Sequence, residues 1–224
     1  QEAHFVFKSL QATYNIKAVF SHQETGNKLT YDRDIEIQKY FDAQQIPWHE
    51  YQQNGVIRKL RSRKNWASLW KQKMQSAPDV VDLKNSQFLH LDEAYYKTIK
   101  GPELPIAITT YHPSFQRGGE SFAWKYLQSF LKDRYQNYSF HISKPLLSRK
   151  GCSRLSPYLS YGNISMRMVY QHTMQIYPDS KSKRALSNFI SRLHWHCHFI
   201  QKFEDECRIE FENINRAYDT IIKP

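Results

Sequence analysis

The sequence predicts an α/β segment that contains part of a parallel sheet, followed by an all-helical region. Strand-like and helix-like patterns alternate up to about residue 80, which is typical of parallel α/β units. From Arg117 onward, apolar residues recur with the 3.6-residue period of amphipathic helices. Between these regions periodicity is weak and Pro and Gly are frequent, which predicts a long connector. We therefore expect three regions, 1–80, 81–117 and 118–224.

The first region is expected to contain two helices and two strands. A helix over roughly residues 1–14 precedes the β-branched and aromatic run IKAVFSH, residues 16–22, which is typical of a buried strand. A turn at Gly26-Asn27 leads to a helix over about residues 31–45. The run IPWHEYQQ, residues 46–53, is expected to be the next short strand. There is no GxGxxG, so the usual dinucleotide fingerprint is absent here.

A basic run follows the second strand. Five cations occur within VIRKLRSRKNW, namely Arg58, Lys59, Arg61, Arg63 and Lys64. Such a strip can contact phosphates, but a solvated loop or helix face has the same composition. Trp66 and Trp70, four residues apart, are expected to pack inward.

The third region is predicted to be a series of helices. One begins after Gly118-Gly119 and carries its apolar stripe through Ala123, Leu127 and Phe130. Further apolar stripes predict helices that begin near Met166 and near Leu186. A last helix is expected along Cys207, Phe211, Ile214 and Tyr218.

The stretch GCSRLSPYLSYGNIS, residues 151–165, combines helix starts and stops. Ser156 is suited to N-cap a helix that has Pro157 at its first position, Gly162 can end that helix, and Asn163 or Ser165 can cap the next. The free N–H groups of such a start, together with Ser153, Arg154 and Ser156, would form an anion cradle. An ordinary pair of capped helices fits the same spacing.

The cluster HWHCHF, residues 194–199, raises the question of a metal site. His194 and His198 are four residues apart, a spacing that can chelate a transition metal. Cys197 belongs to the core stripe of its helix, however, and the sequence has no HExxH and no second ligand pair. We therefore predict no metal and interpret these histidines as polar flanking groups or ligand-facing groups.

Composition narrows the possible partners. The 224 residues carry 32 Lys and Arg against 21 Asp and Glu, a formal net charge of +11, which favours a polyanion such as nucleic acid. Aromatic residues make up 15% of the chain and can stack on bases or planar cofactors as well as fill a core. The 3 cysteines include no CxxC, which favours a reducing compartment over a disulfide scaffold. No apolar run approaches membrane-spanning length, and we expect a cytoplasmic protein without a membrane partner.

Both ends read as interior sequence. Residue 1 is not Met and begins what reads as a helix already under way, and the last residues, NRAYDTIIKP, carry no capping signal or polar tail. We expect the chain to be a piece of a longer protein.

Three further stretches carry a resemblance. RGGESFAWKYLQSFLKDR, SRLSPYLSYGNIS and RLHWHCHFIQKFEDE occur in the same order and spacing as in the photolyase/cryptochrome family, and SHQETGNKLTYDRDIEIQKYF resembles part of that family's α/β domain. The resemblance covers nearly the whole chain, and SRLSPYL is its most specific part. It implies a truncated, central piece of the family architecture: part of the N-terminal α/β domain over 1–80, the interdomain connector over 81–117, and the first part of the helical FAD-binding domain over 118–224.

The resemblance also implies an FAD site. In the family, the segment that matches CSRLS holds the FAD phosphates, which implies cofactor contacts from Cys152, Ser153, Arg154, Leu155 and Ser156. Cys152 stands where Thr is common, so one hydroxyl contact is missing. A Tyr shortly before the segment touches FAD in relatives, and Tyr138 is the candidate here. A second, antenna chromophore of unknown identity is a further family feature.

A DNA-facing site is implied as well. Trp195 matches the Trp that borders the flavin cavity where lesion DNA docks, next to Arg192 and His196. Arg192 stands where many pyrimidine-dimer photolyases have Glu, and His196 replaces a common Arg. Position alone leaves a second interpretation open, in which Trp195 packs under a neighbouring helix.

The resemblance implies a light-responsive flavoprotein that acts on DNA. We expect a deoxyribodipyrimidine photolyase-like lyase, a monomer that repairs UV pyrimidine photoproducts in damaged duplex or single-stranded DNA by blue-light-driven electron transfer. No catalytic residue is assigned. Because Arg192 and His196 differ from the residues common in photolyases, the alternative is a cryptochrome-type sensor or a DNA-binding flavoprotein without repair activity. A basic nucleic-acid module without a cofactor is the third possibility.

Overall fold

The computed structural model describes residues 2–221, which pack as two units. Unit 1 comprises the described residues up to Gln53, from Asp79 to Thr110, and from Lys202 onward. Unit 2 comprises Asn54–Pro78 and Tyr111–Gln201. These units reflect packing contacts, and the assignment of 1–80, 81–117 and 118–224 to family domains stays a prediction.

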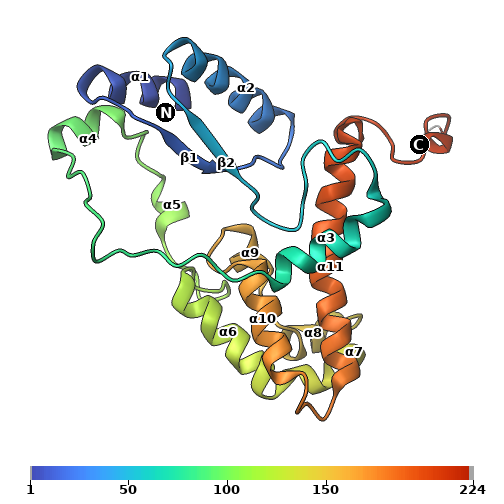
Figure 1. Cartoon of the computed structure of the whole chain (residues 1–224). Coiled ribbons are helices and arrows are strands. Elements are labelled where there is room, and N and C mark those ends of the chain that lie inside the picture. The colour runs from blue at the N-terminus through green and yellow to red at the C-terminus, as the bar shows by residue number, and fades with distance from the viewer. Residues whose placement is uncertain (1, 222–224) are drawn as a thin grey trace. The chain divides into compact units, whose positions relative to one another are not determined.

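Unit 1 contains the strand pair. Helix α1 (Ala3–Thr13), strand β1 (Val19–His22), helix α2 (Lys28–Ala43) and strand β2 (Trp48–Tyr51) follow one another, and both helices lie beside the strands (Figure 1). The strands pair in parallel with Val19 opposite Trp48, as the alternating pattern predicted. Both strands are shorter than predicted, and α2 begins three residues earlier because the Asn27 side chain caps it by accepting from the N–H of Thr30.

The connector also contributes to unit 1. It is mostly irregular but forms two short helices, α4 (Glu93–Ile99) and α5 (Ile106–Thr109), which the weak periodicity did not indicate. Asp92 caps α4 by accepting from the N–H of Ala94. Tyr95 packs edge-on against Tyr14, which follows α1, with 5.8 Å between ring centroids. Helix α4 is therefore attached to α1.

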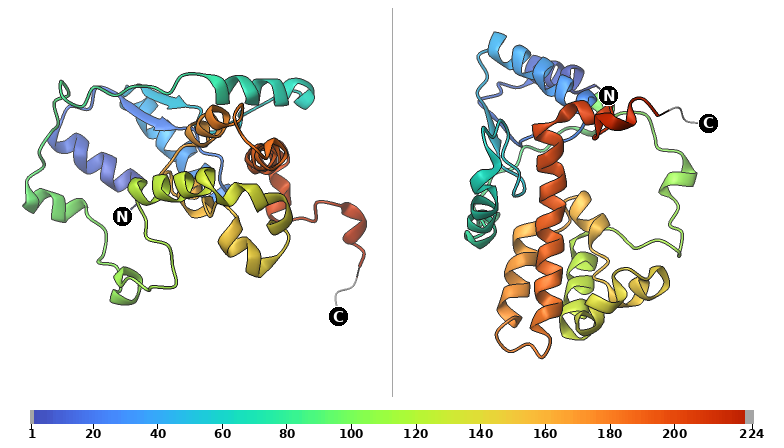
Figure 2. Two further views of the ribbon diagram at one scale, coloured as in Figure 1. Left: turned by 90° about the horizontal axis from the view of Figure 1, so that it is seen from below. Right: turned by 90° about the vertical axis from the view of Figure 1, so that its right-hand side faces the viewer.

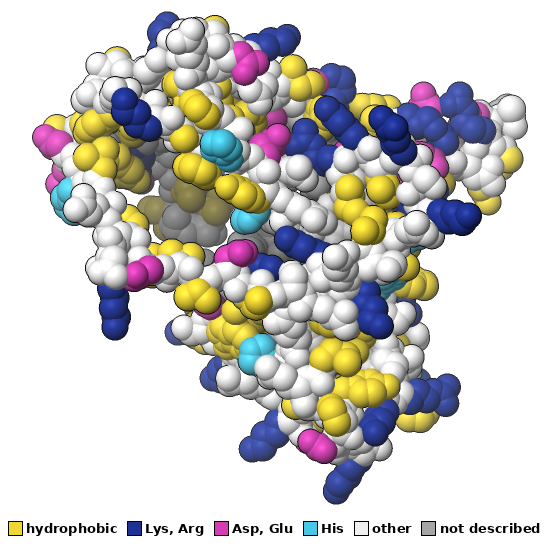
Figure 3. All heavy atoms as spheres, viewed as in Figure 1, with side chains coloured by type: hydrophobic (Ala, Val, Ile, Leu, Met, Phe, Trp, Pro, Cys, Tyr) yellow, Lys and Arg dark blue, Asp and Glu magenta, His cyan; other side chains and the backbone are white. Residues whose placement is uncertain are grey.

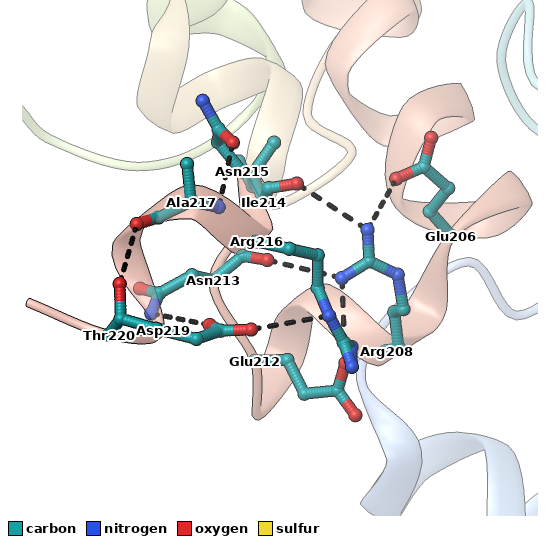
Figure 4. Close-up of polar contacts among 10 residues, drawn as sticks. All are labelled: Glu206, Arg208, Glu212, Asn213, Ile214, Asn215, Arg216, Ala217, Asp219 and Thr220. Carbon is teal, nitrogen blue, oxygen red and sulfur yellow. Dashed lines mark hydrogen bonds and ion pairs between the residues drawn. The ribbon is translucent and has the colours of Figure 1, made fainter.

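The predicted last helix is wrong. Helix α11 (Lys183–Asp205) ends before Cys207, and the chain continues as two 3-10 turns, η3 (Cys207–Glu210) and η4 (Arg216–Tyr218). The Arg208 guanidinium donates to the carbonyls of Asn213 and Ile214, which draws the chain into a loop that a helix cannot form (Figure 4). Ion pairs of Arg208 with Glu206 and Glu212 complete this network.

Unit 2 is helical. After the 3-10 turn η1 (Arg63–Asn65), its elements are α3 (Trp66–Gln75), α6 (Glu120–Lys132), η2 (Arg134–Asn137), α7 (Tyr138–His141), α8 (Pro145–Gly151), α9 (Ser156–Ser160), α10 (Met166–Ile176) and α11 up to Gln201. Helices α6, α10 and α11 run side by side (Figures 1 and 2). No strand occurs between residues 164 and 218, all of which are described, as the helical periodicity predicted.

The predicted apolar stripes form the core of unit 2. Ala123, Leu127 and Phe130 of α6 are fully buried, and Phe130 meets Phe189 of α11 with 4.7 Å between ring centroids. The two tryptophans of α3 point inward as predicted: Trp70 packs edge-on against Tyr170 of α10. This single core fixes the helices that carry most of the predicted site residues.

Two contacts attach the segment before α3 to this core. The Gly55 carbonyl accepts from the Trp66 indole at 2.9 Å, and a Cβ at Gly55 would lie 2.0 Å from Cδ1 of Trp70, so only glycine fits. The Gln201 side chain is completely buried, accepts from the N–H of Ile57 at 2.7 Å and donates to the Ile57 carbonyl at 3.0 Å. Both backbone groups of Ile57 are thereby satisfied.

Candidate cofactor and nucleic-acid site

The segment Cys152–Ser156 links α8 to α9. Gly151 is buried against His141, and a Cβ there would lie 1.9 Å from the ring nitrogen Nδ1. Leu155 is 2% exposed, so its side chain belongs to the core of unit 2 and anchors the segment to that core. The Ser153 side chain is half-buried and that of Ser156 is exposed. The two hydroxyl-bearing residues therefore flank a residue that points into the core.

The predicted capping pattern is correct at one helix and wrong at the other. Ser165 caps α10 by accepting from the N–H of Met168, and Gly162, with φ of +67°, follows the end of α9. Ser156 does not cap α9: it is the first residue of that helix, and Leu155 occupies the N-cap position without a side-chain hydrogen bond. The Ser156 hydroxyl is therefore not used in capping.

Arg154 has an unusual backbone conformation. Its φ is +63°, in the left-handed region that costs energy for a residue with a side chain. Gln116 binds both the backbone and the side chain of Arg154. Its Nε2 donates to the Arg154 carbonyl at 2.9 Å, and its Oε1 accepts from Arg154 Nε at 3.2 Å. The adjacent Arg117 carbonyl accepts from the Tyr158 hydroxyl at 2.8 Å. The turn that ends the connector thus fixes the predicted cofactor segment.

Arg134 forms hydrogen bonds that connect the same segment to α6. Its guanidinium donates to the carbonyls of Cys152 and Tyr126 and to the Ser129 hydroxyl. Burial lowers the pKa of Arg134, and burial raises the pKa of the Cys152 thiol against the opposing influence of Arg134 and Arg154. The Cys152 side chain is therefore a neutral thiol at neutral pH.

Tyr138 lies near two other predicted site residues. It is 5% exposed and packs edge-on against Phe130 and Phe189. Burial raises the pKa of its hydroxyl, with Cys152 raising it further and Arg192 lowering it. Cys152 of the predicted cofactor site and Arg192 of the predicted DNA-facing site therefore both lie within electrostatic reach of the Tyr138 hydroxyl.

The surface of α11 carries the predicted nucleic-acid residues. The Arg192 guanidinium lies 4.3 Å from the ring centroid of Trp195, and Trp195 is 47% exposed, so it does not pack under a neighbouring helix. Phe199 continues this aromatic surface, with its ring 5.9 Å from that of Trp195. His196 differs: it is half-buried, burial lowers its pKa, and its Nδ1 is buried without a hydrogen-bond partner.

His194 and His198 pack against the aromatic residues of α3. His194 lies 4.7 Å from Trp66 and 4.9 Å from Trp70, and His198 Nδ1 lies 2.8 Å from Nη2 of Arg63. No group of three or more His, Cys, Asp or Glu side chains among the described residues is arranged to hold a metal ion. The two histidines therefore contribute to packing between α3 and α11.

The basic run before α3 is partly used in this packing. The Arg63 guanidinium lies over the Trp66 ring, 5.3 Å from its centroid, whereas Lys59, Arg61 and Lys64 are exposed. Lys and Arg side chains are spread over the visible face of the molecule (Figure 3). A phosphate-contacting role for the exposed cations stays a prediction.

Comparison with known proteins adds independent information. No protein-family model matches the chain. A curated deoxyribodipyrimidine photo-lyase of Alkalihalophilus pseudofirmus is 34% identical over 92 residues, which are 40% of this chain and 18% of that protein. The crystal structure of a bacterial class III photolyase from Agrobacterium tumefaciens superposes with a TM-score of 0.70 over 100% of this chain, at 16% identity. The chain is photolyase/cryptochrome-like.

A cryptochrome has the same fold. The structure of Synechocystis sp. PCC6803 cryptochrome matches 88% of this photolyase-like chain with a TM-score of 0.58 and 16% identity. The chain spans about half of each solved relative, 48% of the photolyase and 43% of the cryptochrome. Within the described residues, no helix is long and apolar enough to cross a membrane.

Sequence reasoning missed two residues that hold the Cys152–Ser156 segment in place. Gln116 acts on Arg154 from 38 positions away, and Arg134 acts on Cys152 from 18 positions away. Arg134 ends the stretch RGGESFAWKYLQSFLKDR, but nothing in that stretch indicates its contact with the Cys152 carbonyl. Gln116 precedes the stretch, and its contacts with the carbonyl and Nε of Arg154 leave no local signal in the sequence.

Proposed function

We propose that this protein binds FAD and uses light-driven electron transfer to repair pyrimidine photoproducts in DNA. The fold match to a class III photolyase along the whole chain is the observation that carries the proposal. The partial sequence match to a deoxyribodipyrimidine photo-lyase supports it. DNA as partner, a monomeric state and a cytoplasmic location follow from the proposal and stay predictions.

The side chains of the Cys152–Ser156 segment fit the phosphates of FAD. The Ser153 and Ser156 hydroxyls are donors that no cap consumes, and Gln116 engages only Nε of Arg154, which leaves the two terminal guanidinium nitrogens for an anion. The raised pKa of Cys152 keeps a negative charge away from the phosphates. When bound, FAD supplies the light-driven electron transfer. Tyr138 would border the cofactor from the core side.

An FAD titration tests this assignment. In the intact protein, the double variant Ser153→Ala/Ser156→Ala is expected to bind FAD more weakly, because each hydrogen bond to a charged phosphate is worth about 1.5–3 kcal/mol. Ser160→Ala, at the exposed end of the same helix α9, is the matched control. The flavin-to-protein ratio from absorbance is the measurement. An unchanged ratio in the double variant would reject the phosphate contacts.

The exposed Arg192–Trp195 pair supports a DNA-facing surface. A large ring beside a guanidinium suits a flat base and its phosphate, and stacking is worth about 1–3 kcal/mol per base. Trp195→Ala is therefore expected to weaken binding of lesion-containing DNA more than binding of undamaged DNA. Phe88→Ala, which removes an exposed ring from the connector, is the control. DNA binding overall is expected to weaken steeply with salt, and an affinity independent of salt would contradict a role of the net charge.

A blue-light sensor without repair activity is the second candidate. Two observations favour it: the fold match to a cryptochrome, and the cation Arg192 beside Trp195, at the position where many pyrimidine-dimer photolyases have Glu. Light-dependent repair of defined photoproducts by the intact protein separates the two. We expect weak repair of cyclobutane dimers. Efficient dimer repair would show that the argument from Arg192 is wrong.

A second chromophore, if bound, needs a cavity of its own. Unit 1 has a pocket of about 460 Å³ between the start of α2 and the end of α11 with the segment that follows it. Its walls include the rings of Tyr31, Phe203 and Phe211, which suit a flat chromophore. The cations Lys28 and Arg208 are offset there by the acids Asp32, Glu204 and Glu210, so the lining does not select a charge. We assign the antenna chromophore to this pocket. Loss of a non-flavin absorption band in Phe211→Ala, at constant FAD content, is the expected result.

A further inference from the structure

A groove in unit 2 has no role in the function proposed above. It lies between the turn that ends the connector, residues 111–117, and the outer face of α6, and its volume is about 460 Å³. This is within the range of small-molecule sites, about 300–1,000 Å³. None of its lining residues belongs to the segments that resemble the family's FAD phosphate contacts.

The turn that forms one wall is held in place. The N–H of Phe115 donates to the His112 carbonyl at 3.0 Å, and the Tyr111 hydroxyl donates to the Phe115 carbonyl at 3.3 Å. Gln116 and the Arg117 carbonyl attach the turn to Arg154 and Tyr158. The opposite wall is a regular helix. Both walls therefore exist before any ligand arrives, which reduces the entropy cost of binding.

The lining combines aromatic rings with positive charge. Four of its side chains are aromatic and two are cations, and no Asp or Glu is among its lining residues; the rings are Tyr111, Phe115, Phe122 and Tyr126, and the cations are Arg117 and Lys125. The Arg117 guanidinium lies 4.8 Å from the Tyr111 centroid, and the Phe115 side chain is 71% exposed. Exposed rings offer stacking surfaces, and unopposed cations favour an anion.

We propose that this groove binds a nucleotide, with the base stacked on the aromatic wall and the phosphate held by Arg117 and Lys125. The size, the rings and the absence of acids from the lining together select a planar group that carries negative charge. An uncharged base would leave the two cations unused, and inorganic phosphate would leave the rings unused. Both parts of a nucleotide are therefore needed for full affinity.

Calorimetric titration of the protein as purified, with whatever flavin it carries, tests this assignment. AMP is expected to bind at least about tenfold more tightly than adenosine or inorganic phosphate, since stacking and the charge-assisted contact each contribute a factor of that order. Arg117→Gln and Phe115→Ala are each expected to weaken AMP binding about tenfold. Lys132→Gln, which removes an exposed cation from the same helix outside the groove, is the matched control and should change nothing.

The outcomes separate this site from the FAD site. Loss of AMP binding in the groove variants at constant flavin content supports the groove, whether or not the protein repairs DNA. Equal AMP binding by wild type and variants, competition between AMP and FAD, or no AMP binding would overturn it. A short oligodeoxyadenylate distinguishes the sources of the ligand: tighter binding that the same variants weaken points to single-stranded nucleic acid, and binding no tighter than AMP points to a free nucleotide.

Discussion

The two packing units differ in how their elements are held together. Among the described residues of unit 1, the buried apolar core consists of Ile37, Phe41 and Ile46, and Phe20 on β1 is 64% exposed. Many of the remaining contacts are surface ion pairs such as those of Arg208. Unit 2 instead has one continuous core to which α3, α6, α9, α10 and α11 all contribute.

This difference bears on where a precise site can be built. Exposed ion pairs contribute little stability, and a two-stranded sheet with a small core is marginal by itself. The Cys152–Ser156 segment is attached to the larger core through Leu155 and through Tyr158 of α9. A segment that must hold phosphate groups at fixed positions therefore lies on the better-packed unit.

Deletion of one buried ring in each unit is the strongest test of this comparison. Phe130→Ala is expected to lower the free energy of unfolding of unit 2 by about 3–5 kcal/mol, because it leaves a cavity between Tyr138 and Phe189. Native-state hydrogen exchange should show lost protection in α6, α10 and α11 but not in α2. Phe41→Ala is the matched variant in unit 1. If either variant lowered the protection from hydrogen exchange equally in both units, the two units would unfold as one cooperative structure.

Added volume tests the packing of unit 2 from the opposite direction. Gly55→Ala places a Cβ 2.0 Å from a ring atom of the buried Trp70, and overpacking of this kind costs about 1–3 kcal/mol. Gly118→Ala is the control, since no atom lies within 4 Å of its Cβ position. The midpoint of urea unfolding is the measurement. A midpoint unchanged by Gly55→Ala would mean that the Trp70 ring is not fixed.

The attachment of the turn to the cofactor segment is expected to have a moderate effect. Gln116→Ala removes two hydrogen bonds to Arg154, each worth about 1 kcal/mol net, and releases the left-handed conformation at that residue. FAD affinity should fall together with thermal stability. Gln128→Ala, exposed on α6, controls for loss of a glutamine. If stability falls while FAD affinity does not, Gln116 has no positioning role.

The smallest expected effect is a pH dependence that arises in unit 2. Burial, then His198 and Arg63, lower the pKa of His194 below its ordinary value of 6.5. The unfolded chain therefore takes up this proton first, so stability is full above about pH 6.5 and decreases as pH falls from there toward the lowered pKa. The loss of stability should be the smallest of these effects and should disappear in His194→Gln. The exposed His90→Gln is expected to leave the pH profile unchanged.

The fold was predictable where a single element carried its own pattern. The apolar stripe through Ala123, Leu127 and Phe130 indicated both the position of α6 and its buried face. The parallel strand pair followed from alternation of helix and strand. The last predicted helix failed because Arg208 forms hydrogen bonds to carbonyls five and six residues ahead, and periodicity does not register such contacts.

The candidate site was predictable only in part for the same reason. The SRLSP stretch carries a strong local signal, and its hydroxyl-bearing residues could be named from it. The left-handed backbone of Arg154 and its two hydrogen bonds to Gln116 depend on a turn that is distant in sequence. Ser156 failed as a cap because Pro157 allows the helix to begin one residue earlier than the capping pattern assumed.

Gln201 acts as a substitute for one residue of a β-strand. Its amide offers an acceptor and a donor to the N–H and the carbonyl of Ile57, as the backbone of a neighbouring strand would. Few side chains can imitate a peptide group in this way: Glu has no donor, Asn is one methylene shorter, and Leu would leave both backbone groups of Ile57 buried and unsatisfied. Variation at position 201 is therefore restricted by the main chain of a distant segment, whatever residue occupies position 57.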